Sequence, residues 1–149
     1  MSDTEIPLNP RQVARRLALQ ALYAWLLTQN ALRAIELDVI DEQATKKPCD
    51  RPYLHELLEQ IPIHQQALEN SLARYSSRAL SAVSPVERAI LLIGAYDLCH
   101  RLEIPLKVAI NEAVDLAKTY GATDGYRFIN GVLDKLAEEV RSPKAPQGK

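Results

Sequence analysis

The stretch from Ser84 to Arg101 restricts the fold more than any other part of the chain, and it reads S-P-V-E-R-A-I-L-L-I-G-A-Y-D-L-C-H-R. Between Ala89 and Cys99 the residues are apolar nearly all the way round a helical wheel, and only Asp97 interrupts them. A helix without a polar face has to be enclosed by other helices. We therefore expect this stretch to form the central helix of a helical core.

The same stretch begins with residues that start helices. Ser84 can accept a backbone N–H, Pro85 suits the first helical position, and Glu87 can reach back to the cap in a capping box. Inside the helix, Gly94 indicates the close approach of a neighbouring helix. Asp97 is expected to be a buried carboxylate hydrogen-bonded to a neighbouring helix; the alternative, a catalytic acid, has no partner nearby in the sequence.

Composition favours a single all-α domain. The chain has 149 residues, of which 47% are hydrophobic, 25% charged and 5% aromatic, and no stretch alternates apolar and polar residues long enough to predict a strand. Because the net charge is −1, a polyanionic partner would have to meet a local basic patch. Cys49 and Cys99 are isolated in the sequence, which favours two reduced thiols over a disulfide or a metal site.

Membrane and enzyme signals are missing from the sequence. No apolar run approaches the roughly 18 residues that span a bilayer, and residues 1–9 hold no apolar signal core, so we expect a cytoplasmic protein with no membrane partner. There is also no nucleophile elbow, phosphate-binding glycine loop, metal-ligand cluster or dinucleotide fingerprint. This argues against an enzyme, and we expect no catalytic residue, metal or cofactor. The functional candidate that remains is a binding surface.

The first helix carries the first candidate for such a surface. We expect it to begin at Pro10, with Asn9 as its cap. The side opposite its apolar face and the flanks of that side hold guanidinium, amide and phenol groups, from Arg11, Arg15, Arg16, Gln20 and Tyr23. Arginine charge beside a planar ring can engage phosphates and unstacked bases. The alternative is a solvated surface with the Tyr23 ring packed against a neighbouring helix.

The region between the first and the central helix carries no chemical motif. We expect helices over 30–44, 53–60 and 63–75, a loop over 45–52, an interruption at Pro62 and a short segment over 76–83. The helix over 30–44 should turn a set of acidic residues to solvent, namely Glu36, Asp38, Asp41 and Glu42.

A helix should follow the central one after the break at Ile104 and Pro105. Gly121 is expected to close it, and Tyr120 is expected on its inward face. Glu112 belongs to the same inward stripe, and we interpret it as a structural carboxylate whose partner the sequence does not name.

The last helix is expected to begin after Asp124 as its N-cap. Gly131 within it indicates another close crossing of helices. Lys118 and Arg127 flank the turn between the last two helices, with Phe128 beside them. These residues form a second basic cluster.

Four segments, in their order and spacing, resemble the NusB family of transcription antitermination factors. They are A-L-Q-A-L-Y-A-W from Ala18, V-E-R-A-I-L-L-I-G-A-Y-D-L from Val86, I-P-L-K-V-A-I-N-E-A-V-D-L-A-K from Ile104 and F-I-N-G-V-L-D-K-L-A from Phe128. The third and fourth segments are specific. The resemblance covers nearly the whole chain and is weakest over 30–84 and in the tail.

The resemblance implies an all-helical fold of two packed subdomains with about seven helices. The helical domain would cover 10–140, with subdomains over about 10–83 and 84–140, and the polar ends would form a flexible tail over 1–9 and a disordered tail over 141–149. It also implies a protein that binds the boxA element of ribosomal RNA leader transcripts together with the ribosomal protein NusE. This pair would join RNA polymerase and other Nus factors in a complex that suppresses termination.

The resemblance also implies functional positions. RNA binding would fall to residues on the first helix and around the last turn, namely Arg11, Arg15, Arg16, Gln20, Tyr23, Lys118, Asp124, Arg127 and Phe128. Gln12 and Val13 stand where a fuller arginine run is often found in the family, which puts RNA binding without NusE in question. Glu87 and Arg88 would contact NusE, so we expect the Glu87 carboxylate to cap the free protein and to be shared or released on binding.

Two alternatives to a monomeric adaptor stay open. The first is an RNA-binding module associated with ribosomal RNA methylation, because helical domains similar to NusB precede some ribosomal RNA cytosine methylases; the lack of a glycine-rich cofactor loop disfavours it. The second is a homodimer whose interface covers the RNA surface, a state that some members of the family form.

Overall fold

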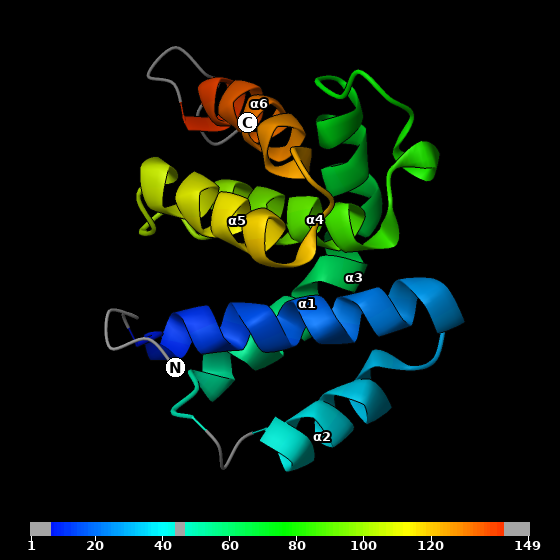
Figure 1. Ribbon diagram of the computed structural model, residues 1–149, viewed down its shortest axis with the longest axis vertical. Helices are drawn as coiled ribbons and strands as arrows, with labels where there is room; N and C mark the ends of the chain where they lie inside the picture. Colours follow the sequence, from blue (N-terminus) through cyan, green and yellow to red (C-terminus); the bar gives the residue numbers. More distant parts are fainter. Residues whose placement is uncertain (1–6, 44–46, 142–149) are drawn as a thin grey trace.

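Six α-helices and one short 3₁₀ helix make up the computed structural model, which describes residues 7–43 and 47–141 and, for residues 41–43, the backbone alone (Figure 1). The elements are α1 Pro10–Thr28, α2 Leu32–Gln43, α3 Arg51–Ala73, η1 Leu80–Ala82, α4 Pro85–His100, α5 Leu106–Tyr120 and α6 Gly125–Arg141. The described residues contain no strand, and the all-α prediction is confirmed.

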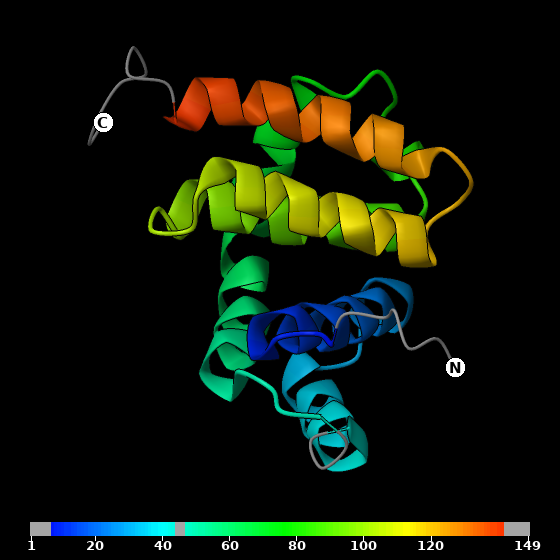
Figure 2. The ribbon, with the colours of Figure 1, turned by 60° about the vertical axis from the view of Figure 1, so that its left-hand side comes forward.

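The helices form two groups that are joined by α3 (Figure 2). Helices α4, α5 and α6 pack against one another in one group, and α1 and α2 pack together in the other. Helix α1 also lies against α4, and the long α3 contacts α1, α2, α4 and α6. The division into subdomains near residue 83 stays a prediction, because α3 belongs by its contacts to both groups.

Helix α4 is the enclosed central helix. Its residues from Ala89 to Leu98 are all buried, and α1, α3, α5 and α6 surround them. A Cβ at Gly94 would lie 2.7 Å from Leu133 Cδ1 on α6 and 3.4 Å from Ala113 Cβ on α5. The central position of this helix and the close crossing at Gly94 are therefore confirmed.

Two of the three predicted caps, Asn9 and Ser84, accept a backbone N–H at the start of their helices, whereas the Asp124 carboxylate before α6 is directed to Arg127 instead. Asn9 Oδ1 accepts from Gln12 N at 2.8 Å and Gln12 Oε1 accepts from Asn9 N at 2.9 Å, which makes a capping box at α1. At α4, Ser84 Oγ accepts from Glu87 N at 3.2 Å. The Glu87 carboxylate is turned toward Gly125 at the start of α6 instead of back to the cap, because the missing side chain of this glycine leaves room there.

Helix α3 is continuous, so the predicted interruption at Pro62 is wrong. Proline in a helix interior costs about 3 kcal/mol relative to alanine. Apolar side chains on both sides of it, including Ile61 and Leu68, are buried in the core, and their burial offsets this cost.

Two further expectations about single residues are wrong. Glu36 does not face solvent as Asp38 does, because it is buried with its Oε2 at 3.0 Å from His55 Nδ1 of α3. The side chains of Asp41 and Glu42 lie outside the described residues. Gly131 makes no close crossing, since it is exposed and no atom lies within 4 Å of the place that a Cβ would take.

Both ends of the helical domain extend beyond the predicted boundaries. Leu8 packs against the core, and Arg141 belongs to α6. The Arg141 guanidinium donates to four backbone carbonyl oxygens at the end of α4 and in the following loop, those of Asp97 at 3.1 Å, Leu98 at 2.8 Å, Arg101 at 3.2 Å and Ile104 at 2.9 Å. The remaining predicted tail residues, 1–6 and 142–149, lie outside the described residues. None of the described helices is long and apolar enough to cross a membrane.

Candidate nucleic-acid interface

Two adjacent arginines of α1 lie in different surroundings. Arg15 is only 3% exposed, and its Nε lies 3.2 Å from Asp97 Oδ2 of α4 and donates to Tyr53 OH of α3 at 3.1 Å. The expectation that Arg15 stands on an RNA-facing surface is therefore at odds with the structure. The reason is that a buried carboxylate and a buried phenol already occupy its guanidinium. Arg16 points the other way, toward α5.

Asp97 is the buried carboxylate that the sequence predicted, and its partners come from α1 and α3. Tyr53 OH donates to Asp97 Oδ2 at 2.6 Å, and the Arg15 guanidinium approaches the same oxygen. Burial raises the pKa of Asp97, while Arg15 opposes that rise; burial and the nearby Asp97 charge raise the pKa of Tyr53. This group is an interior connection between three helices.

Glu112 on α5 is also a structural carboxylate, and its partners lie on α1. Gln12 Nε2 donates to Glu112 Oε2 at 3.0 Å, and Arg15 Nη1 lies 3.9 Å from Glu112 Oε1. The interaction fixes the first turns of α1 against α5.

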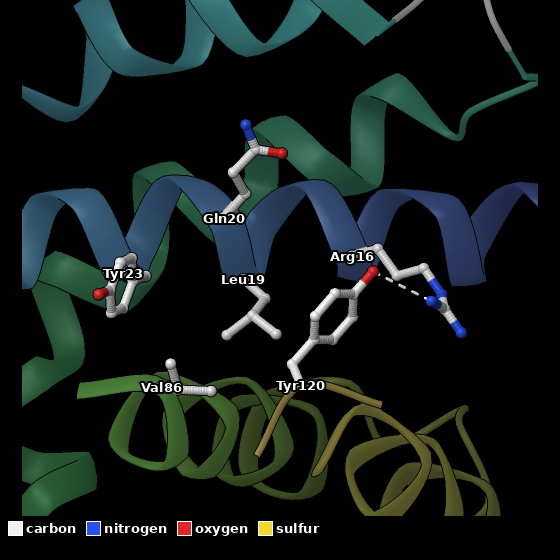
Figure 3. Close-up of a pocket in the computed structure, with 6 residues that line it drawn as sticks. All are labelled: Arg16, Leu19, Gln20, Tyr23, Val86 and Tyr120. Atoms are coloured by element: carbon white, nitrogen blue, oxygen red, sulfur yellow. Dashed lines mark hydrogen bonds between the residues drawn. The ribbon is translucent and has the colours of Figure 1, made fainter. Parts of the chain in front are cut away.

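An open cavity of about 240 Å³ lies between α1 and the ends of α4 and α5 (Figure 3). Arg16 Nη1 donates to Tyr120 OH at 3.0 Å, and the guanidinium lies 5.5 Å from the centroid of that ring. Figure 3 shows Tyr23 at the opposite end of the cavity, with Leu19 between the two phenols and Val86 below. Tyr23 and Tyr120 are 39% and 47% exposed, respectively.

Tyr120 was expected on the inward face of its helix, and that expectation is wrong. It lies in the last turn of α5, where its exposed hydroxyl accepts from Arg16 of α1 instead of packing in the core. The cavity thus places a guanidinium beside two half-exposed rings, a combination that suits phosphates and unstacked bases.

A second cavity of about 180 Å³ continues from Arg16 to Lys118. Lys118 Nζ lies 5.0 Å from the centroid of the Tyr126 ring, and the Arg127 guanidinium lies 5.4 Å from the same centroid. The cavity therefore brings Arg16 of the first basic cluster near Lys118 of the second, and the Tyr126 ring joins Lys118 to Arg127. Two carboxylates, those of Glu112 and Asp115, also line this cavity and offset part of the positive charge of its cations.

Of the other predicted RNA positions, Gln20 lines the first cavity, whereas Arg11 and Asp124 line neither of the two. Gln20 is exposed. Arg11 is half-exposed with its Nε at 3.6 Å from Asp50 Oδ2. Asp124 precedes α6 with a φ of 66°, and its Oδ1 lies 3.5 Å from Arg127 Nε. An aspartate tolerates this left-handed conformation better than most residues.

A groove of about 400 Å³ lies between η1 and the turn that joins α5 to α6, and we call it the η1 groove. Arg78, Glu87 and Phe128 line it, together with residues of the turn. Glu87 is only 4% exposed, and Arg78 Nη2 lies 3.8 Å from its Oε1. The Arg78 guanidinium also lies 4.0 Å from the centroid of the Phe128 ring.

Arg88, the second predicted partner contact, is paired with α3. Its Nε and Nη2 donate to the two carboxylate oxygens of Glu69 at 2.8 Å and 2.9 Å. Arg88 is not among the residues that line the η1 groove. Its ion pair fixes the first turn of α4 against α3.

Sequence reasoning missed Arg78, Tyr120 and Tyr126 as parts of these surfaces. Tyr120 and Tyr126 each lie within two residues of a basic side chain in the sequence, and this pairing could have indicated them. Nothing in the sequence near Arg78 indicates its contact with Phe128. Within the described ranges, no group of three or more histidine, cysteine, aspartate and glutamate side chains could hold a metal, and Cys49 and Cys99 are free.

Comparison with known proteins decides the family. The model of the NusB family matches residues 12–138. A transcription antitermination protein NusB from Ralstonia nicotianae is 47% identical over 136 residues, which cover 91% of this chain and 87% of that protein. The chain belongs to the NusB family of transcription antitermination proteins. A NusB from Yersinia pestis (strain Pestoides F) is 45% identical over 134 residues, covering 90% of this chain and 96% of its own.

Solved structures of NusB share the fold. NusB of T. maritima superimposes with a TM-score of 0.80 at 27% identity, over 89% of this chain and 94% of that one. A crystal structure of the antitermination factors NusB and NusE in complex with double-stranded RNA matches with a TM-score of 0.78 at 23% identity, over 85% and 95% of the two chains.

Proposed function

We propose that this NusB-family chain is an adaptor that binds the boxA element of ribosomal RNA leader transcripts together with the ribosomal protein NusE. It joins RNA polymerase and other Nus factors in an antitermination complex, and it performs no catalytic step. The observation that carries this proposal is the series of exposed and half-exposed cations and aromatic rings along α1, the end of α5 and the start of α6.

The run suits single-stranded RNA by its chemistry. Exposed rings such as Tyr23 and Tyr120 offer stacking platforms, each worth about 1–3 kcal/mol per base. Cations between the rings meet the phosphates. We assign the RNA surface to Arg11, Arg16, Gln20, Tyr23, Lys118, Tyr120, Tyr126 and Arg127, with Asp124 orienting Arg127 and Phe128 at the edge toward the η1 groove. Arg15 supports this surface from the interior.

The η1 groove is the proposed site for NusE. The Glu87 carboxylate lines the groove and would attract a cationic side chain of the partner. Arg88 contributes by fixing the start of α4 through Glu69. A structurally related NusB crystallised with NusE and double-stranded RNA, and this assembly supports the choice of partners.

The proposal is tested by fluorescence anisotropy with boxA RNA, with and without NusE. Arg16→Ala should weaken RNA binding in the presence of NusE by roughly tenfold, the weight of one charge-assisted contact of about 1.5 kcal/mol. Arg33→Ala is the matched control, because it removes the same charge from the exposed side of α2. A native chain that ignores boxA even with NusE present would overturn the proposal.

A homodimer is the competing occupant of the α1 surface. Light scattering with and without boxA RNA separates the two states, because RNA should dissociate a dimer whose interface covers the cations. A dimer that persists unchanged in saturating RNA would place the RNA surface elsewhere.

A further inference from the structure

Arg78 touches both a proposed NusE contact and a proposed RNA contact. Its Nη2 lies 3.8 Å from Glu87 Oε1, and its guanidinium lies 4.0 Å from the centroid of the Phe128 ring. The two distances show one guanidinium held between a carboxylate of α4 and an aromatic ring of α6. The Arg78 side chain is itself 46% exposed, so it can leave this position without unpacking the core.

In the free protein, the Glu87 carboxylate is not accessible to a cationic side chain of a partner. Its side chain is 5% exposed and lies against Gly125 on one side. Among the described residues, Arg78 supplies the one cationic group within 4.0 Å of this carboxylate. A cation of the partner therefore has to take the place of Arg78 to reach Glu87.

Phe128 is covered by the same side chain. A guanidinium over the face of a phenyl ring occupies the face on which a base would stack. When Arg78 leaves Glu87, its hold on the ring is weakened because only the exposed cation–π contact remains. Replacement of Arg78 by another cation at Glu87 thus makes the face of the Phe128 ring more accessible to a base.

We propose that Arg78 is a positioning residue that couples the two sites: it covers Phe128 while it is paired with Glu87, and NusE binding at Glu87 releases it and opens the ring to RNA. The inference rests on the proposed function and adds how NusE strengthens RNA binding. By thermodynamic linkage, RNA must strengthen NusE binding by the same factor.

The chain offers a direct probe of this ring, because Phe128 is its single phenylalanine. Fluorophenylalanine incorporated in its place gives one ¹⁹F resonance, which reports the covering of the ring without any RNA. We expect Arg78→Ala to shift this resonance and NusE to move the native resonance toward the Arg78→Ala position. In the Arg78→Ala chain, NusE should move the resonance little further.

Anisotropy with boxA RNA gives the functional arm. Without NusE, Arg78→Ala should bind RNA roughly two- to fivefold more tightly than the native chain, the factor that corresponds to an exposed cation–π contact. The enhancement of RNA binding by NusE should fall by the same factor. Arg78→Lys keeps the charge but not the planar group, so equally tight RNA binding by this variant shows that uncovering the ring causes the effect.

Arg74→Ala is the matched control, because it removes the same charge from a residue that pairs with Glu139 instead. It should change neither the resonance nor the enhancement by NusE. The coupling is overturned if NusE binds and leaves the native resonance in place, or if Arg78→Ala and Arg78→Lys bind RNA no more tightly than the native chain. If the native chain binds neither NusE nor RNA, the proposed function itself is overturned, and the coupling with it.

Discussion

Arg15 Nε of α1 lies 3.2 Å from Asp97 Oδ2 of α4 inside the protein, while the next residue, Arg16, faces the surface cavity. Two arginines that are adjacent in the sequence therefore have different roles. The first connects the two helical groups, and the second stands beside the rings proposed for RNA.

Arg15→Ala should lower the free energy of unfolding by about 3–5 kcal/mol, because it leaves the buried Asp97 carboxylate without its cation. Arg16→Ala should change it by less than about 1 kcal/mol, since its contact with Tyr120 is exposed. Urea denaturation of both variants measures the difference. An Arg15→Ala chain of native stability that fails to bind RNA would contradict this role.

The loss in Arg15→Ala should also depend on pH. Without Arg15, nothing on α1 opposes the rise in the pKa of Asp97 that burial causes. A carboxyl group whose pKa is higher in the folded than in the unfolded state binds a proton preferentially when folded, so the folded variant gains relative stability as the pH falls. Denaturation curves between about pH 7 and 4 should show that the difference in free energy of unfolding between Arg15→Ala and the native chain becomes smaller as the pH falls.

Gly94 and Gly131 form a matched pair in two helix interiors. Gly131→Ala should raise the free energy of unfolding by about 0.5–1 kcal/mol, because it gains helix propensity in open space. Gly94→Ala should lower it by about 1–3 kcal/mol, because the new Cβ meets the fully buried Leu133 side chain. Equal effects of the two substitutions would mean that α4 and α6 do not approach at Gly94.

RNA affinity should depend on salt through the four cations of the proposed surface, namely Arg11, Arg16, Lys118 and Arg127. With about four phosphate contacts to single-stranded RNA, the log–log slope is roughly 3, so affinity should fall on the order of fifty-fold between about 50 and 200 mM salt. Anisotropy titrations in the presence of NusE measure it. A flat response would exclude phosphate contacts.

His64 of α3 and His100 of α4 give the stability a second dependence on pH. Their ring centroids lie 4.3 Å apart; burial and the neighbouring His64 lower the pKa of His100, and Glu56 opposes this. A histidine whose pKa is lower when folded stabilises the protein above the unfolded pKa of about 6.5, and this contribution is lost as the pH falls below it.

His100→Gln should therefore flatten the stability profile between about pH 7 and 5. One proton changes the free energy of unfolding by at most about 1.4 kcal/mol per pH unit, which sets the largest difference in slope between the two chains. Parallel profiles of the native and substituted chains would show that His100 has the same pKa in both states.

The core was predictable from the sequence because its signal is local. The apolar run of α4 identified an enclosed helix, and Asp97 within it could be recognised as buried and hydrogen-bonded. The partners of Asp97 could not be predicted. Arg15 is 82 positions away in the sequence, and its position on the flank of α1 is compatible with both a buried and an exposed side chain. Likewise, Pro62 by itself predicts a break in the helix, because the sequence does not show the packing on both sides of it that keeps α3 continuous.

The candidate site was predictable in its residue types and less so in its arrangement. Arg16, Tyr23, Lys118 and Arg127 were expected to share one surface, and the structure connects them through cavities and aromatic rings. Arg78 could not be found in advance, because its contacts with Glu87 and Phe128 arise only when η1 folds over the turn between α5 and α6.

The contacts of Arg141 have a consequence for the order in which the chain is completed during translation. The carbonyl oxygens to which its guanidinium donates, at the end of α4 and in the following loop, are synthesised 37 to 44 residues earlier. Until Arg141 has left the ribosome, these oxygens lack its N–H groups, and only those of Asp97 and Arg101 have backbone donors from Arg101 and Ile104 in this region. The half of the protein that holds the η1 groove therefore gains these hydrogen bonds only after α6 has been synthesised.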